Sequence, residues 1–159
     1  MFSEPDEVET AILEDFGDAS ELKRLEALYF RQQERMENDP KVRWDYAISL
    51  VRSKYMADIK SGRRMMEEIM ADPANEEIQI DCLYFLSLAC AKLKDYKDAL
   101  QYVRELLRRK PNHMQAVQLE RIISGRLERE GMKGMAILGG AAMGIGALIG
   151  LGVALARRK

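Results

Sequence analysis

The chain has 159 residues and a formal net charge of −1, and its Lys and Arg are spread among acids on the expected helix faces, which argues against a nucleic-acid partner. Scarce proline and abundant Leu, Met, Ala, Glu, Lys and Arg favour helices, and no stretch alternates Val, Ile and Thr as a strand would. One histidine and two cysteines occur without an HExxH, CxxC or Walker sequence, so we expect no enzyme, cofactor or metal.

Residues 1–19 form an acidic arm with seven Asp and Glu and no Lys or Arg, whereas the rest of the chain holds 25 bases and 19 acids. The arm has neither the basic segment nor the long apolar run of a signal peptide. Ile12, Leu13 and Phe16 allow one or two amphipathic turns, although isolated helices this short are marginal. Two interpretations stay open: a disordered leader, and an autoinhibitory arm that places these three side chains in a binding groove.

Residues 20–130 are expected to form one cytosolic, all-α domain. Apolar residues recur at helical spacing in six segments, namely 20–38, 40–54, 57–70, 76–93, 96–110 and 113–130. Asp39 and Pro40 supply an N-cap and a first-turn proline, and Asp95 is a second expected N-cap. Residues 76–93 are apolar most of the way round, so this helix should be central. The pattern predicts a six-helix bundle of antiparallel hairpins.

Residues 80–113 match a tetratricopeptide-like unit of 34 residues. Ser87 and Ala99 fall where its two helices should touch, and Gly62 has the same role in a weaker preceding unit, 40–73. Plain core packing in a non-repeat bundle is the alternative. In a repeat array the first helices line a concave groove that binds a helix or an extended peptide. The residues expected on this exposed face are Asp81, Tyr84, Leu88, Ala91, Trp44, Ile48 and Arg52.

Residues 135–156 carry no charge over 22 positions and follow a glycine-containing linker, 131–134. As a helix they would extend roughly 33 Å, enough for a hydrocarbon core of about 30 Å. We expect a transmembrane helix that tail-anchors the chain in the lipid bilayer, followed by a basic tail, 157–159. The tail residues are Arg157, Arg158 and Lys159.

Small residues form two GxxxG pairs in this segment, Gly140 with Gly144 and Gly146 with Gly150. Such pairs let two membrane helices approach closely, so they predict a homo-oligomer. The same residues also lower the hydrophobicity of the segment, which would steer it away from the endoplasmic reticulum. Both interpretations stay open with equal weight.

Four stretches of the chain together resemble the mitochondrial fission 1 protein family. They are WDYAISLVRSKY (44–55), CLYFLSLACAKLKDYKDALQYVRELL (82–107), KPNHMQAVQLERII (110–123) and GMKGMAILGG (131–140). The resemblance implies two tetratricopeptide-like hairpins on the cytosolic face of the mitochondrial outer membrane, and also of peroxisomes. It implies recruitment of a dynamin-related GTPase, directly or through an adaptor, to divide the organelle.

The resemblance makes Asp81, Tyr84 and Leu88 the better-placed contacts in the groove. Ala91 stands where many members of the family carry an aromatic residue, which makes the groove floor shallower here. The basic tail, by the same resemblance, favours delivery to mitochondria.

Two other functions compete with the fission receptor. A chaperone-docking tetratricopeptide receptor would need a clamp of Lys, Asn and Arg; Arg52 and Lys92 suit one, but the groove residues of the central helix do not. A structural dimer built by the anchor alone is the other.

Overall fold

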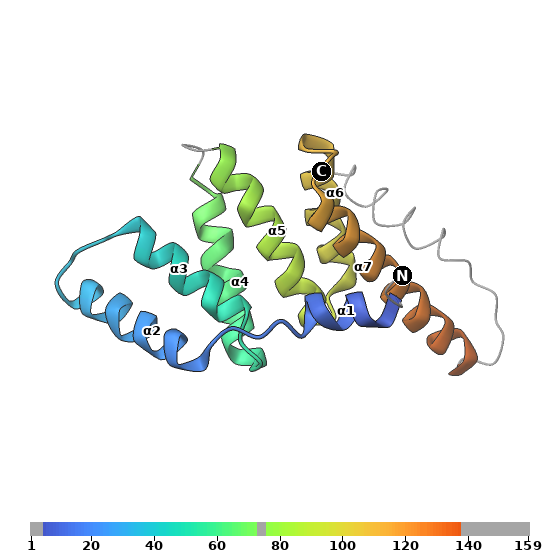
Figure 1. Ribbon diagram of the computed structural model, residues 1–159, viewed down its shortest axis with the longest axis horizontal. Coiled ribbons are helices and arrows are strands. Elements are labelled where there is room, and N and C mark those ends of the chain that lie inside the picture. Colours follow the sequence, from blue (N-terminus) through green and yellow to red (C-terminus); the bar gives the residue numbers. More distant parts are fainter. Residues whose placement is uncertain (1–4, 73–75, 138–159) are drawn as a thin grey trace, which may run out of the picture. The chain divides into compact units, whose positions relative to one another are not determined.

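The computed structural model describes residues 5–72 and 76–137, with side chains for residues 7–72 and 76–131. All regular elements in these ranges are helices (Figure 1). They are α1 (Pro5–Leu13), α2 (Ala19–Glu34), α3 (Pro40–Val51), α4 (Met56–Met70), α5 (Glu76–Lys92), α6 (Tyr96–Arg109) and α7 (Met114–Ile137). The chain forms two compact units, residues 1–126 and 127–159.

The described residues thus hold seven helices, one more than predicted, because part of the acidic arm folds as α1. The other six follow the predicted order. Successive helices pack on one another from α2 to α6, and α5 also contacts α1 and α3 (Figure 1). The prediction that α5 is central is therefore confirmed.

Aspartates begin two of the helices as N-caps. The Asp18 carboxylate accepts a hydrogen bond from Ser20 N at 2.8 Å, and that of Asp39 accepts one from Lys41 N at 2.9 Å ahead of Pro40. Asp95 stands at the N-cap position of α6 but makes no capping bond there. Its carboxylate instead accepts from Arg63 Nη1 on α4 at 2.8 Å, because an arginine from a neighbouring helix competes for it.

The small residues lie at close contacts between helices, as predicted. Ser87 Oγ donates to the Ala99 carbonyl at 2.8 Å between α5 and α6, and both residues are fully buried. Gly62 on α4 packs directly on the end of α3. Cys82 and Cys90 are free and fully buried, and burial raises the pKa of each thiol to about 12.

α7 continues through residues 131–134 and ends at Ile137. Residues 138–159 lie outside the described part of the chain, and with them the predicted packing glycines and basic tail, that is Gly140, Gly144, Gly146, Gly150, Arg157, Arg158 and Lys159. Among the helices that the structure describes, none has the length and apolar character needed to cross a bilayer.

Candidate functional site

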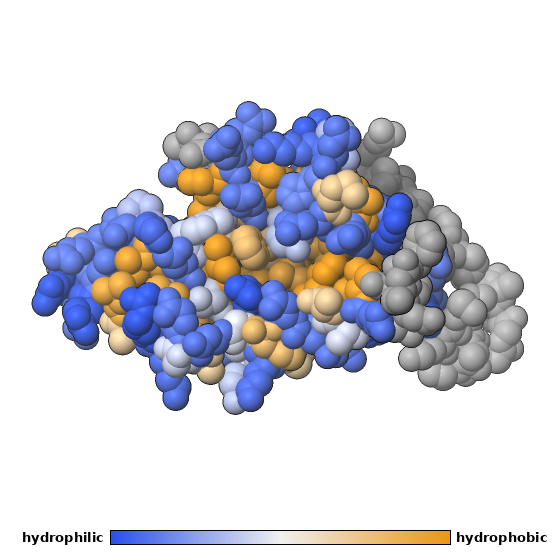
Figure 2. Space-filling view, viewed as in Figure 1, coloured by the Kyte–Doolittle hydropathy of each residue, from blue (hydrophilic) through white to orange (hydrophobic). Residues whose placement is uncertain are grey.

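A cavity of about 590 Å³ lies where α3, α5 and the beginning of α7 meet, and we call it the groove. Residues four apart share one face of a helix, which aligns Trp44 and Ile48 of α3 with Arg52, its C-cap, so that all three line the groove with residues of α5. Figure 2 shows apolar surface over the middle of this face, framed by polar side chains. The groove is lined by Ala11, Ile12, Asp15, Trp44, Ile48, Arg52, Asp81, Tyr84, Phe85, Leu88, His113, Gln115 and Gln118.

Six of the seven predicted groove residues therefore line one cavity, and Ala91 lines a smaller one beside it. The expectation that the α5 residues are all exposed is wrong for two of them: Leu88 is 6 % exposed and Ala91 is 3 % exposed. Residues of the arm lie beside both positions. Ile12 shares the groove with Leu88, and Leu13 shares the smaller cavity with Ala91.

The arm is held at the groove by polar contacts from two helices. Arg52 Nη2 donates to both carboxylate oxygens of Asp15 at 3.1 Å, and the Arg52 carbonyl accepts from Gly17 N at 3.0 Å. Glu9 of α1, a buried residue, forms an ion pair with Arg126 of α7. α1 thus occupies part of the surface that the sequence predicts for a partner.

Lys92 joins the end of α3 to the arm. Its Nζ donates to the carbonyls of Val51 and Ser53 at 2.9 and 3.1 Å and lies 5.0 Å from the centre of the Phe16 ring. Such a cation over an aromatic face is attractive. Burial lowers the pKa of Lys92 to about 8; Asp15 opposes this shift and Arg52 adds to it.

This pKa predicts a rise in stability with pH. Between pH 8 and 10.5 the unfolded chain holds a proton on Lys92 that the folded chain has released. Folding is therefore favoured progressively as the pH increases across that window. Denaturation at about pH 7.5 and about pH 9.5 should show that the unchanged chain gains stability relative to Lys92→Met. An unchanged difference, with exposed Lys97→Met as control, would contradict the assignment.

A row of aromatic rings crosses the groove wall. Trp44 meets Phe85 edge to face at 6.1 Å between ring centres, and Tyr84 stacks on His113 at 5.8 Å. The sequence predicts an exposed His113 near a helix start. The structure confirms the helix start, because His113 Nδ1 accepts from Ala116 N at 3.1 Å, but the ring is half-buried since it packs on Tyr84.

The sequence analysis missed several residues of the groove. Phe85 lies four residues after Asp81 and three before Leu88, so helical spacing could have placed it on the same face. His113, in contrast, is 29 positions from Tyr84, the ring on which it stacks. No local periodicity reports such a pairing. The only sequence feature that pointed to Asp15 was the acidic charge of the arm, which does not distinguish it from the other acids there. The missed residues are Ala11, Asp15, Phe85, His113, Gln115 and Gln118.

The groove offers aromatic rings, amides and a guanidinium, which bind a peptide rather than break a bond. Within residues 5–72 and 76–137, no three His, Cys, Asp or Glu side chains gather closely enough to hold a metal ion.

Known proteins are similar to the chain in sequence and in fold. The family model for the Fis1 C-terminal tetratricopeptide repeat matches residues 80–132. The chain is 37 % identical to the mitochondrial fission 1 protein of Mus musculus over 94 % of this chain and 98 % of that protein. The Homo sapiens protein is 36 % identical over the same shares.

Solved structures give the same result for the fold. Yeast Fis1 in complex with an Mdv1 fragment, which contains an N-terminal extension and coiled-coil domains, superposes with a TM-score of 0.66 at 23 % identity, over 75 % of this chain and 91 % of that one. Saccharomyces cerevisiae Fis1 alone gives 0.62 at 24 % identity, over 82 % and 95 %. With this fold and an identity above 35 % along nearly its whole length, the chain belongs to the mitochondrial fission 1 protein family.

Proposed function

We propose that the chain is a receptor on the mitochondrial outer membrane whose groove binds a cytosolic adaptor, and through it a dynamin-related GTPase that divides the organelle. Direct binding of the GTPase and a second pool on peroxisomes belong to the same proposal. The family consists of tetratricopeptide-type binding proteins, not enzymes. One solved relative, yeast Fis1, was crystallised with an Mdv1 fragment.

One observation carries this proposal: the groove already holds a short amphipathic helix. α1 brings Ile12 to the cavity, and Asp15, two residues after its end, pairs with Arg52. A surface that accepts one amphipathic helix of this kind suits another, supplied by a partner. The arm then acts as an autoinhibitory segment that a partner must displace, with Ile12, Leu13 and Phe16 as its apolar contacts.

The membrane part of the proposal rests on residues 135–156. These 22 residues lack any charge and match the thickness of a bilayer as a helix. Anchoring the groove confines its partner to one surface and raises the local concentration, so modest affinity at each groove suffices. The small-residue pairs within this segment support self-association in the same membrane.

A chaperone-docking receptor is less favoured by the geometry. An acidic chaperone tail would need free cations on the groove helices. Lys92 donates to two backbone carbonyls instead, and the α5 residues that line the groove include Asp81, whose charge would repel an acidic tail.

Proximity labelling from the anchored chain tests the proposal. The unchanged chain should label a dynamin-related GTPase or a coiled-coil adaptor, and Tyr84→Ala should reduce that labelling severalfold because it removes an aromatic contact from the groove. Its own mitochondrial location should not change. Tyr84→Ala is preferable to Leu88→Glu, since Leu88 is buried and a charge there would disturb the fold.

The matched control is Tyr102→Ala, which removes a half-buried tyrosine from α6, outside the groove. Labelling that survives Tyr84→Ala, both in the intact chain and in one that lacks residues 1–17, would remove the groove as the recruiting site.

A further inference from the structure

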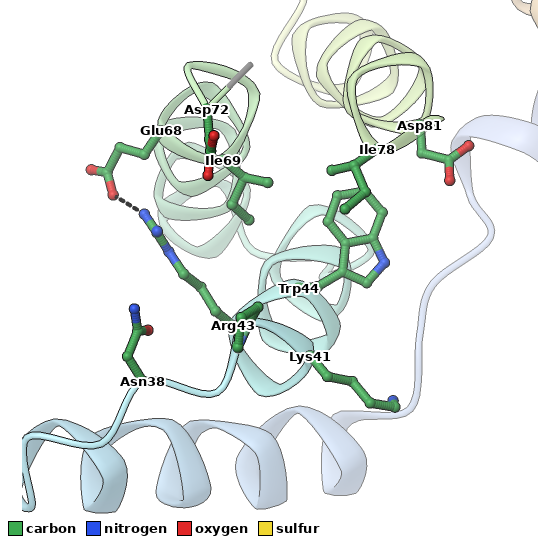
Figure 3. A pocket seen from close by; sticks show the side chains of 10 residues that line it. Asn38, Lys41, Arg43, Trp44, Glu68, Ile69, Asp72, Ile78 and Asp81 are labelled. Atoms are coloured by element: carbon green, nitrogen blue, oxygen red, sulfur yellow. Dashed lines mark hydrogen bonds and ion pairs between the residues drawn. The ribbon is translucent and has the colours of Figure 1, made fainter. Parts of the chain in front are cut away.

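A second pocket of about 410 Å³ opens beside the groove, between the start of α3, the end of α4 and the start of α5. We call it the entry pocket. Figure 3 shows Trp44, Ile69 and Ile78 around the hollow, with the Arg43–Glu68 ion pair on one side and Asp81 on the other. Ile78 is 40 % exposed, a large fraction for an isoleucine. The pocket therefore presents apolar surface to water, which favours a ligand.

The entry pocket is continuous with the groove. Trp44 and Asp81 line both cavities, so one bound segment can occupy the two in sequence. Arm residues line the groove, yet none of the described arm residues lines the entry pocket. With the arm docked, arm residues therefore form part of the groove wall, whereas the entry pocket stays clear of them.

Charge differs between the two cavities. At the covered end, the groove, Arg52 is paired with an acid of the arm, Asp15. The open end, the entry pocket, instead presents an exposed acid, Asp81.

In the entry pocket, two cationic residues already form ion pairs with acids: Lys41 pairs with Asp45 at 2.5 Å, and Arg43 pairs with Glu68 at 2.7 Å. Asp81 is exposed and makes no ion pair with any residue that the structure describes. The open end therefore complements a cation, and the covered end complements an anion.

The arm pairs incompletely with Arg52. A single nitrogen, Nη2, serves both oxygens of Asp15 at 3.1 Å, and Arg52 Nε is buried with no hydrogen-bond partner among the described residues. A well-placed carboxylate engages two guanidinium nitrogens at about 2.7–2.9 Å. A competing carboxylate can thus bond Arg52 better than the arm does.

We propose that the entry pocket is the first docking site for an amphipathic partner segment that inserts a large apolar side chain beside Trp44 and places a Lys or Arg on Asp81 while the arm is still docked. The same segment then carries a carboxylate to Arg52 and displaces the arm. This inference rests on the proposed function of the groove as a receptor, and it adds the chemistry of the ligand and the order of events.

A displayed library of random peptides of about 16 residues tests the ligand chemistry, with the full chain in lipid nanodiscs as bait. Selected peptides should carry Lys or Arg within one helical turn of a large apolar residue. Asp81→Lys should bind these peptides about fivefold to tenfold more weakly and select acidic residues instead. Glu34→Lys, the same charge change on α2, is the matched control. A basic preference that is absent, or that survives Asp81→Lys, would overturn the proposal.

Stopped-flow fluorescence tests the order of events, since Trp44 is the single tryptophan of the chain. Mixing with a selected peptide should give a fast phase that grows with peptide concentration, followed by a slower phase from the departure of the arm. Deleting residues 1–17 should abolish the slow phase and change the fast rate less than about twofold. One phase whose rate saturates would mean that the arm leaves first, which contradicts the proposal.

Neither measurement needs the cellular partner. Loss of the basic motif would leave recruitment through the groove intact. If Tyr84→Ala did not reduce recruitment but the selected peptides still carried the basic motif, the proposed function of the groove would be wrong. The entry pocket would then remain a peptide-binding site.

Discussion

Deleting residues 1–17 is expected to raise the affinity of the chain for a groove-binding peptide by about tenfold to a hundredfold. A ligand that ends in the space held by α1 must offset the free energy of arm docking, whether it first contacts the closed or the open state. An arm docked by about 1.4–2.7 kcal/mol lowers apparent affinity by that factor. Titration of both chains with one peptide, followed by Trp44 fluorescence, measures the ratio.

The contacts of α1 support a docking energy of this modest size. A helix of nine residues is marginal alone, so it persists through Ile12 and the Glu9–Arg126 ion pair. A second ion pair, Asp15–Arg52, holds the segment that follows the helix. The Asp15–Arg52 pair is exposed and contributes little. The deletion ends before Asp18 because that carboxylate caps α2, and its loss would destabilise a second helix.

A charge swap separates loss of docking from loss of chain length. Glu9→Arg should open the arm and raise affinity, and Glu9→Arg combined with Arg126→Glu, which re-forms the ion pair with the charges exchanged, should restore the lower value. Equal affinity in the deleted and intact chains would mean that α1 does not compete with ligands.

Gly62→Ala is expected to lower the free energy of unfolding by about 1–3 kcal/mol. A Cβ on Gly62 would lie 2.8 Å from Val51 N and 2.9 Å from Leu50 Cβ, closer than real contacts allow. The obstacle is the backbone of α3, which also carries Trp44 and Arg52, so α3 and α4 must move apart. Urea denaturation in detergent micelles measures the loss.

Gly125→Ala on α7 is the matched control, since its Cβ would meet nothing within 4 Å among the described atoms. There the substitution should stabilise the helix by about 0.5–1 kcal/mol, because alanine loses less backbone freedom on folding. The same chemical change should therefore have opposite signs at the two glycines. Equal effects would show that packing at Gly62 is looser than the structure indicates.

Much of the fold follows from signals that act within a few residues. Asp39 and Pro40 begin α3 where the sequence predicts. Residues 76–93 carry apolar side chains around most of the helix, and this identifies α5 as the central helix. Spacing by three and four places most of the predicted groove residues on adjoining faces. These features depend on helical geometry alone, which a single sequence reports well.

What the sequence does not reveal depends on contacts between distant segments. α1 is too short to be stable without the groove, so its helix is a tertiary effect. Leu88 and Ala91 are buried, and each shares a cavity with an arm residue more than 70 positions earlier in the chain. Asp95 does not make the expected capping hydrogen bond, because Arg63, 32 residues earlier, donates to its carboxylate. Local propensity cannot report any of these interactions.

The two native thiols have a practical consequence. Alkylating reagents attack thiolates, and Cys82 and Cys90 are fully buried with pKa values raised to about 12. Maleimide at neutral pH should therefore react with neither cysteine while the chain is folded. A cysteine introduced at exposed Glu14 can then carry a single dye without removal of either native residue. The movement of the arm becomes visible one molecule at a time, on the intact chain in its membrane.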